Sequence, residues 1–295
     1  MAQMSSIFDT LSALGVASLE QREILSHSTR DREDLAVYRD RQSGVIYIDG
    51  FYAGDETYEE GSYRKVNLET LGSRDYEVVC DAERRASAYR PYVTGRRIVE
   101  FGCGDGAFLF KVRAETRSCC GVELQRDYVH LLNEAGVACH QSMQPLADET
   151  QDTVLSFHVV EHLPEPIPVL RQCHRVLKPG GLVIVEVPHA NDFLLSGLQS
   201  EAFRKFTLWS QHLVLHTRDS LKRLLQAAGF TDIVVEGIQR YPLSNHLTWL
   251  AKGRPGGHKS PLAALDTPDL RHAYEAALNK IDATDTLVAI ASKPA

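Results

Sequence analysis

The sequence has no apolar run long enough to cross a membrane. Its apolar stretches are short, as at 182–185, whereas a membrane-spanning helix needs about 18–20 apolar residues. The first fifteen residues contain neither a basic segment nor a continuous apolar core, so we expect no signal peptide. These absences predict a cytoplasmic protein that does not associate with membranes.

The sequence also lacks an excess of positive charge and the cysteine pairs of metal sites or disulfide frameworks. Thirty-two basic residues against 39 acidic residues give a net charge of −7, which argues against binding to nucleic acid. The six cysteines contain no CxxC pair, and we expect them to be reduced thiols. We therefore expect a small molecule as the partner.

What is present is ordinary globular composition, with 43% hydrophobic and 24% charged residues. Residues 1–75 have little regular patterning and are predicted to form an N-terminal cap or lid. From residue 76, strand-like and helix-like segments alternate, which predicts a doubly wound α/β core over 76–295 with a mostly parallel sheet. Residues 238–284 form an insertion between the last two predicted strands. We expect helices at 76–89, 107–115, 126–136, 169–177, 217–229 and 269–281.

The stretch EFGCGDGAF is the most informative part of the chain. Gly102, Gly104 and Gly106 follow an apolar strand and open a helix, where glycines allow the backbone to approach a ligand closely. Glu123 ends the next predicted strand, and an acid at this place can accept both hydroxyls of a ribose. The pattern predicts a site for a nucleoside-containing cofactor.

Two cofactors compete for this site. Residues 102–107 satisfy the GxGxxG/A fingerprint of dinucleotide-binding proteins, which leaves an NAD-dependent oxidoreductase as one alternative. Glu100, however, would repel a pyrophosphate and attract an ammonium group. S-adenosylmethionine (SAM) carries an ammonium group and no phosphate, so the residues favour SAM.

The glycine stretch with Glu100, the acid Glu123, FHVVEHL (157–163) and VLKPGGLVIVEVP (176–188) together resemble class I SAM-dependent methyltransferases. Within them the chain is similar to the branch of ubiquinone-type O-methyltransferases and small-molecule or sugar methyltransferases. The resemblance covers about 76–237 and the final strand. It implies a Rossmann-like seven-stranded sheet in the order 3-2-1-4-5-7-6, with the last strand antiparallel.

The resemblance also implies where the cofactor binds. Gly102, Cys103, Gly104, Asp105 and Gly106 would contact the methionine and ribose of SAM. Glu123 would bind the ribose and Leu124 the adenine. The acid that often follows the third strand is missing here, and Gln141 or Ser142 would substitute for it. His158 would face the site of methyl transfer.

His158, Glu161 and His162 also match the HxxEH spacing of certain zinc proteases. That motif requires a helix, whereas His158 ends a predicted strand, so zinc hydrolysis is disfavoured. Some relatives use a divalent metal, but we do not favour a metal at Glu161 and His162. These two residues are equally well explained as groups that orient the loop and cap the next helix.

Four histidines lie at the predicted edge where ligands bind in open α/β sheets, one at the end of a strand and three on loops. Because the pKa of histidine lies near 6.5, any one of them could deprotonate an acceptor hydroxyl. The alternative for each is a hydrogen bond to loop backbone. These candidate bases are His158, His162, His189 and His212.

The acceptor site is predicted from the segments outside the core. The N-terminal cap offers Tyr58, Tyr63 and Arg64, and the insertion offers polar groups that suit a sugar-like or secondary-metabolite acceptor. A subclass of deoxysugar C-methyltransferases with an N-terminal zinc module is disfavoured, since no cysteine precedes Cys80. The apolar spacing of helix 269–281 indicates packing or a homodimer contact. The insertion candidates are Arg240, Tyr241, Asn245 and His246.

The sequence therefore predicts a SAM-dependent methyltransferase that acts on a hydroxyl, or less favourably an amine, of a small polar metabolite. The alternatives are an NAD-dependent oxidoreductase and a non-catalytic SAM-binding protein.

Overall fold

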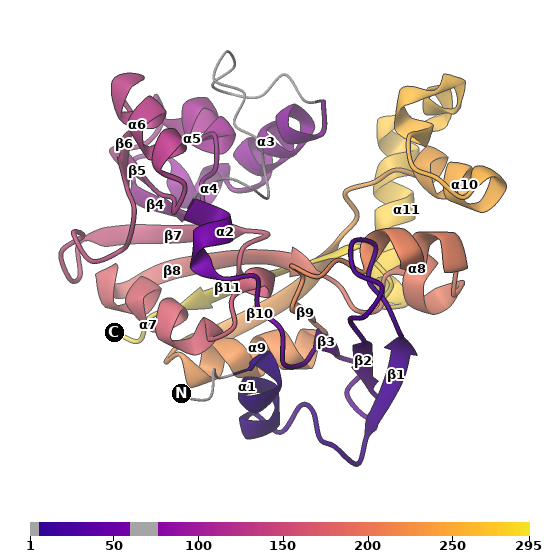
Figure 1. Cartoon of the computed structure of the whole chain (residues 1–295). Helices are drawn as coiled ribbons and strands as arrows, with labels where there is room; N and C mark the ends of the chain where they lie inside the picture. Colours follow the sequence, from indigo (N-terminus) through magenta and orange to yellow (C-terminus); the bar gives the residue numbers. More distant parts are fainter. Residues whose placement is uncertain (1–5, 60–75) are drawn as a thin grey trace.

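The main sheet has seven strands in the order β10-β11-β8-β7-β4-β5-β6 in the computed structural model, which describes residues 6–59 and 76–295 (Figure 1). The pairs β6·β5, β5·β4, β4·β7 and β7·β8 are parallel, and β11 runs antiparallel to both of its neighbours. Counted along the chain, this is the predicted order 3-2-1-4-5-7-6, so the predicted fold is confirmed. The strands are β4 (Arg97–Phe101), β5 (Ser118–Val122), β6 (Ala138–His140), β7 (Gln151–Phe157), β8 (Leu177–Pro188), β10 (Thr231–Ile238) and β11 (Thr286–Ser292).

Helices cover both faces of this sheet and bury its alternating apolar side chains (Figure 1). One face packs against α3 (Tyr76–Ala88), α4 (Arg90–Val93), α5 (Ala107–Val112) and α6 (Arg126–Glu134). The other face packs against α7 (Pro166–Val176) and α9 (Arg218–Ala227). Across the described ranges, no helix combines the length and apolarity that crossing a membrane requires.

A second, antiparallel sheet combines two distant parts of the chain. Its order is β1-β2-β3-β9. The three N-terminal strands therefore share a sheet with a strand that begins about 25 residues after the end of the core strand β8. The helix α1 (Ile7–Ala13) packs on it through Ile7 and Leu11. The N-terminal segment is thus joined to the loop that precedes α9. The strands are β1 (Arg22–Ser26), β2 (Val37–Asp40), β3 (Ile46–Ile48) and β9 (Val214–Leu215), and the short helix α2 (Asp55–Glu59) follows them.

Besides α1, α2 and α4, two further α-helices occur where the sequence analysis predicted none. α8 (Glu201–Thr207) begins after Ser200, whose hydroxyl accepts a hydrogen bond from the backbone N–H of Phe203. α10 (Leu243–Lys252) occupies the insertion ahead of the predicted helix α11 (Pro268–Lys280). α7 begins earlier than predicted, at Pro166, because proline is tolerated in the first turn, where its missing N–H has no partner to lose.

Candidate functional site

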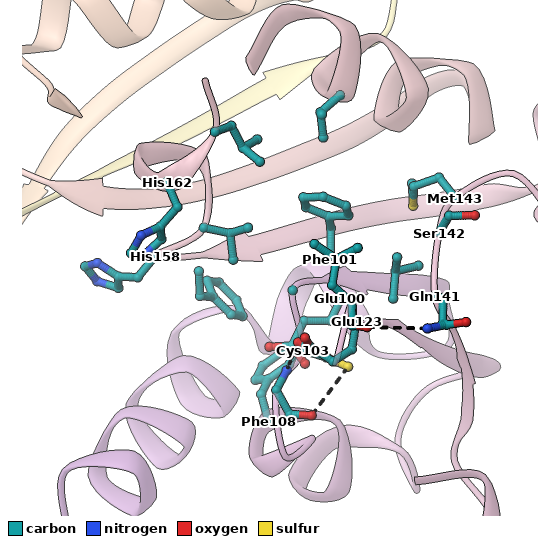
Figure 2. Close-up of a pocket in the computed structure, with 18 of the residues that line it drawn as sticks. Glu100, Phe101, Cys103, Phe108, Glu123, Gln141, Ser142, Met143, His158 and His162 are labelled. Atoms are coloured by element: carbon teal, nitrogen blue, oxygen red, sulfur yellow. Dashed lines mark hydrogen bonds between the residues drawn. The ribbon is translucent and has the colours of Figure 1, made fainter. Parts of the chain in front are cut away.

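A cavity of about 940 Å³ opens at the carboxyl ends of β4, β5 and β7. Figure 2 shows Gln141, Ser142 and Met143 at one end and His158 and His162 at the other, with Glu100 and Glu123 between them. Ligands bind at this edge in open α/β sheets because the loops that follow neighbouring strands converge there. The cavity therefore has a floor made by the glycine loop and two chemically different ends.

The floor requires glycine at two positions. Gly102 has a φ of +75°, and a Cβ there would stand 2.3 Å from Cγ2 of Val159. Gly106 has a φ of +72°, and a Cβ there would stand 2.5 Å from Leu132. Side chains at these places would both strain the backbone and push their neighbours away. Gly102 and Gly106 must therefore remain without side chains in the turn between β4 and α5.

The loop is fixed to Glu123 by a hydrogen bond. The backbone N–H of Gly104 donates to Oε2 of Glu123 at 2.8 Å, and the N–H of Gln125 donates to Oε1 at 3.0 Å. Each carboxylate oxygen keeps a second lone pair, so Glu123 can still accept from two ribose hydroxyls. Asp105 accepts from the N–H of Ala107 at 3.1 Å and so begins α5.

The remaining predicted cofactor residues line the same cavity. Leu124 is 39% exposed, and its carbonyl oxygen lies 3.5 Å from Nε2 of Gln141. Ser142 lies beside Gln141, and Cys103 lies in the glycine loop with its Sγ 3.9 Å from Sγ of Cys139. An apolar surface next to an amide and a hydroxyl suits the flat, hydrogen-bonding adenine ring.

Glu100 is buried in β4, and its Oε2 has no hydrogen-bond partner among the described residues. Burial raises the pKa of Glu100 well above its usual range, although the charge of Arg85 acts in the opposite direction. A buried acceptor without a donor is costly, and an ammonium group in the cavity would supply the donor. The residues present therefore fit SAM.

His158 is held by its neighbours in one protonation pattern. Its Nε2 lies 3.1 Å from Nη1 of Arg240, and because guanidinium can only donate, Nε2 must accept. The proton then sits on Nδ1, which lies 3.3 Å from Oε1 of Glu161. Burial and the charge of Arg240 lower the pKa of His158 well below its usual range. His158 lines the cavity with its basic nitrogen already engaged, which makes it unsuitable as a general base.

His162 shows the opposite arrangement. Its Nδ1 lies 2.7 Å from the carbonyl oxygen of Gln211, and because a carbonyl only accepts, Nδ1 carries the proton. The lone pair is then on Nε2, 3.9 Å from Oε1 of Glu161. Burial lowers the pKa of His162 to about 4, so the ring is neutral at pH 7. The third histidine of the cavity, His212, has its ring centroid 5.1 Å from that of His162.

The side chain of Glu161 is fully buried, and neither of its carboxylate oxygens is hydrogen-bonded to any described residue. Burial raises the pKa of Glu161 to about 8. Potential ligand atoms of Glu161, His162 and His212 lie within 4.8 Å of one another, which is close enough to hold a divalent ion. The sequence analysis did not favour a metal, and that expectation stays a prediction.

Several other predicted residues lie away from the cavity. His189 is fully buried, with Nδ1 donating to the carbonyl oxygen of Thr284 at 2.9 Å, and it does not line the cavity. We therefore correct its assignment as a base: it anchors the segment after β8, because its ring points to the backbone of the insertion rather than to the ligand edge.

The insertion contributes less to the cavity than we expected. Arg240 lines the cavity, whereas Tyr241 does not. Oδ1 of Asn245 accepts a hydrogen bond from the N–H of Gly256 at 3.0 Å. Nδ1 of His246 is hydrogen-bonded to the hydroxyl of Tyr274 at 2.6 Å. The assignments of Tyr241, Asn245 and His246 to the acceptor are therefore corrected: Tyr241 lies outside the cavity lining, and the side chains of Asn245 and His246 hydrogen-bond within the insertion. Of the N-terminal candidates, Tyr58 lies in α2, and Tyr63 and Arg64 lie outside the described residues.

Sequence reasoning missed a charged wall on α3. Arg84 donates to both oxygens of the buried Glu186 at 2.9 Å each, and Arg85 donates to Oε2 at 2.8 Å. The guanidinium of Arg85 also lies over the ring of Phe157, 4.4 Å from its centroid, and lines the cavity. Asp81, one turn earlier, pairs with Arg240. In the sequence, only the adjacent arginines of a predicted helix and the acid Glu186 in a predicted strand hinted at these ion pairs, and nothing there showed that they meet.

The strand order 3-2-1-4-5-7-6 with an antiparallel seventh strand is that of the class I SAM-dependent methyltransferase fold. Residues 71–235, more than half of the chain, match the family model described as a methyltransferase domain. The chain belongs to this family and is a SAM-dependent methyltransferase, with SAM as the methyl donor. Membership sets aside the oxidoreductase and non-catalytic alternatives.

Relatives support the same class. A ubiquinone biosynthesis O-methyltransferase from Dinoroseobacter shibae is 27% identical over 211 residues, which cover 62% of this chain and 80% of that protein. A SAM-dependent methyltransferase from Archaeoglobus fulgidus has the same fold, with a TM-score of 0.52 at 23% identity over 73% of this chain and 94% of its own. A phosphoethanolamine N-methyltransferase from Haemonchus contortus, solved with SAM, has a TM-score of 0.54 at 18% identity over 85% and 62% of the two chains.

Proposed function

We propose that the protein transfers the methyl group of SAM to a hydroxyl of a small polar metabolite, with His162 as the general base. The observation that carries the proposal is the hydrogen bond from Nδ1 of His162 to the carbonyl oxygen of Gln211, which puts the basic lone pair on Nε2 of a residue that lines the cavity. An amine acceptor would need no base, since a neutral amine is already a nucleophile. A hydroxyl needs one.

SAM supplies a methyl group on a sulfonium centre, already activated for in-line displacement. The chain must place the acceptor and remove its proton. Alignment of the two reactants contributes up to about 7–11 kcal/mol to lowering the barrier, and a positioned base contributes about 10²–10⁴-fold in rate. His162 takes the proton of the acceptor hydroxyl at Nε2 while the methyl group passes from the sulfonium sulfur to the acceptor oxygen.

The walls of the acceptor side come from outside the core. Tyr52 and Asp55 from the N-terminal segment and Arg240 from the insertion line the cavity with His158. This supports the predicted division into a cap at 1–75, a core at 76–295 and an insertion at 238–284. We assign the acceptor to this polar side. A small-molecule acceptor, a cytoplasmic location and a homodimer stay predictions.

The test is methyl transfer from tritiated SAM to a defined panel. Catechol and methyl glucoside serve as hydroxyl acceptors, and benzylamine and glycine serve as amines, with products identified by mass spectrometry. We expect labelled methyl ethers, at a rate that His162→Ala reduces. Labelled N-methyl products, formed equally by wild type and His162→Ala, would contradict the proposal.

A divalent ion at Glu161, His162 and His212 is the alternative means of acidifying a hydroxyl at this place, and the 4.8 Å cluster favours testing it. The same assay is run after dialysis against EDTA. Unchanged rates support the base. Loss of activity that Mg²⁺ or Zn²⁺ restores would replace the base with a metal.

A further inference from the structure

The environment of His162 is completed by a loop from another part of the chain. Residues 208–213, between α8 and β9, include Gln211, whose carbonyl oxygen accepts a hydrogen bond from Nδ1 of His162. His212, which lines the cavity, follows directly. The position of this loop therefore decides which nitrogen of His162 holds the proton and which faces the acceptor.

The loop is held in place by the N-terminal segment. Asp31, in the bend between β1 and β2, accepts from the N–H of Ser210 at 3.0 Å and from its hydroxyl at 2.6 Å. The hydroxyl of Thr29 donates to the same carboxylate at 2.9 Å. Asp31 lies at the surface, whereas Ser210 is only 3% exposed. One carboxylate thus satisfies both donors of a buried serine that is 179 residues away.

Neighbouring contacts hold the same loop from both sides. The N–H of Arg30 donates to the carbonyl oxygen of Leu208 at 2.7 Å, and its guanidinium lies 4.4 Å from the centroid of a ring of Trp209. On the opposite side, the N–H of Leu213 donates to the carbonyl oxygen of Glu161 at 2.9 Å. The loop is therefore clamped between the N-terminal sheet and the segment that carries His162.

We propose that Asp31 is a positioning residue for methyl transfer: by holding Ser210, it keeps the Gln211 carbonyl on Nδ1 of His162 and so keeps Nε2 as the proton acceptor. The N-terminal segment thereby sets the tautomer of the base in addition to walling the cavity. This inference rests on the proposed role of His162, and the test separates the two.

The chemistry explains why an acid stands at position 31. A carboxylate only accepts hydrogen bonds, so both donors of Ser210 must point toward it. Alanine would leave a buried N–H and a buried hydroxyl without a partner, and the loop would move to find water. Asparagine keeps one acceptor oxygen for the N–H, and its amide can donate to the serine hydroxyl, so it should restore most of the geometry.

The experiment compares Asp31→Ala, Asp31→Asn and Asp34→Ala. Asp34 lies in the same bend, and its side chain is 78% exposed beside Arg32, so it is a matched control. The first readout is the ¹⁵N NMR spectrum of histidine-labelled protein bound to S-adenosylhomocysteine, with His162 assigned from His162→Ala. The second is kcat and KM for SAM in the tritium assay with the best hydroxyl acceptor of the panel.

We expect the Nδ1–H signature of His162 to become a mixture of tautomers in Asp31→Ala, with kcat reduced about 10- to 100-fold and KM for SAM within about twofold. Asp31→Asn should recover most of both, and Asp34→Ala should match wild type. An unchanged His162 signature in folded Asp31→Ala overturns the positioning role. A changed signature with unchanged kcat supports the positioning role and overturns His162 as the base.

Discussion

At the scale of single residues, the cofactor end of the cavity depends most on Glu100, a carboxyl group buried without a donor on Oε2. Its burial in the bare protein is unfavourable, and we propose that the ammonium group of SAM pairs with it. Under this proposal Glu100 contributes to the affinity for SAM through a partner that arrives with the ligand.

Glu100→Gln should weaken binding of SAM and S-adenosylhomocysteine by about 10- to 100-fold, since a hydrogen bond to a charged group contributes roughly 1.5–3 kcal/mol. Isothermal titration calorimetry measures this directly. Glu115→Gln, at an exposed ion pair with Arg90, serves as the control. An unchanged Kd in Glu100→Gln would remove Glu100 from the ammonium site.

The histidines differ in what their nitrogens already contact. His162→Ala should lower kcat by about 10²–10⁴-fold while leaving the Kd of SAM unchanged, because the base acts only in the transition state. His189→Ala should retain kcat and lose about 1–3 kcal/mol of stability, because it leaves the Thr284 carbonyl without its donor. Steady-state kinetics and urea unfolding separate these effects. Full activity of His162→Ala would point to an amine acceptor or to substrate-assisted proton transfer.

The sequence predicts single residues well where local geometry decides and poorly where distant contacts decide. Glu100, Glu123, Gly102 and Gly104 line the cavity as predicted, because a strand followed by a tight turn and a helix fixes their positions, whereas Gly106 does not line it. His189 and His246 share a residue type with His162, but their rings turn to partners in the insertion. No local pattern distinguishes these cases.

At the scale of elements, the turn between β4 and α5 combines two separate requirements for glycine. Gly102→Ala would strain a backbone at φ +75° and drive a methyl into Val159, whereas Gly136→Ala, at φ +76°, would meet open space.

We expect Gly136→Ala to cost about 1–2 kcal/mol of stability with unchanged SAM affinity, which is the cost of the left-handed backbone alone. Gly102→Ala should cost more and should also weaken SAM at least tenfold, because the shifted loop loses its contact with Glu123. Thermal unfolding and calorimetry compare the pair. Equal effects of the two variants would mean that the close approach to Val159 is not needed.

Elements with their own periodic pattern were predicted, and elements made by tertiary contacts were not. α9 and α11 have apolar spacing and threonine caps, so their positions followed from the sequence. β9 has only two residues and exists because β3 pairs with it. α10 carries buried polar groups such as Asn245 and His246, which obscure the helical pattern.

At the scale of the whole molecule, the buried carboxylate of Glu186 ties α3 to the centre of the sheet. Arg84, Arg85 and the hydroxyl of Tyr89 all donate to it, and together they lower the pKa of Glu186 to about 2 despite its burial. The folded state therefore holds this group charged more firmly than the unfolded chain does.

Glu186→Gln should cost about 3–5 kcal/mol at pH 7, because it leaves two guanidinium groups beside a neutral amide. The lowered pKa means that the advantage of wild type is present above about pH 4.5 and is lost as pH falls toward 2. Urea unfolding at pH 7, 5 and 3 should show the difference shrinking. Glu83→Gln, at an exposed pair with Lys111, is expected to change stability by less than about 0.5 kcal/mol. A constant difference across this range would contradict the role of the Glu186 charge.

The strand order of the main sheet was predicted from the resemblance to class I SAM-dependent methyltransferases, whose motifs lie along this sheet. The second sheet did not follow, since its pairing of β3 with β9 joins segments with no shared pattern.

That pairing has a consequence for the timing of synthesis. About 165 residues separate β3 from β9, and a ribosome adding roughly 5–20 residues per second takes on the order of 10–30 s to make them. During this interval the edge of β3 has exposed backbone donors and acceptors but no partner strand. The N-terminal sheet can therefore be completed only after the ribosome has made the loop beside His162 and the strand that follows it.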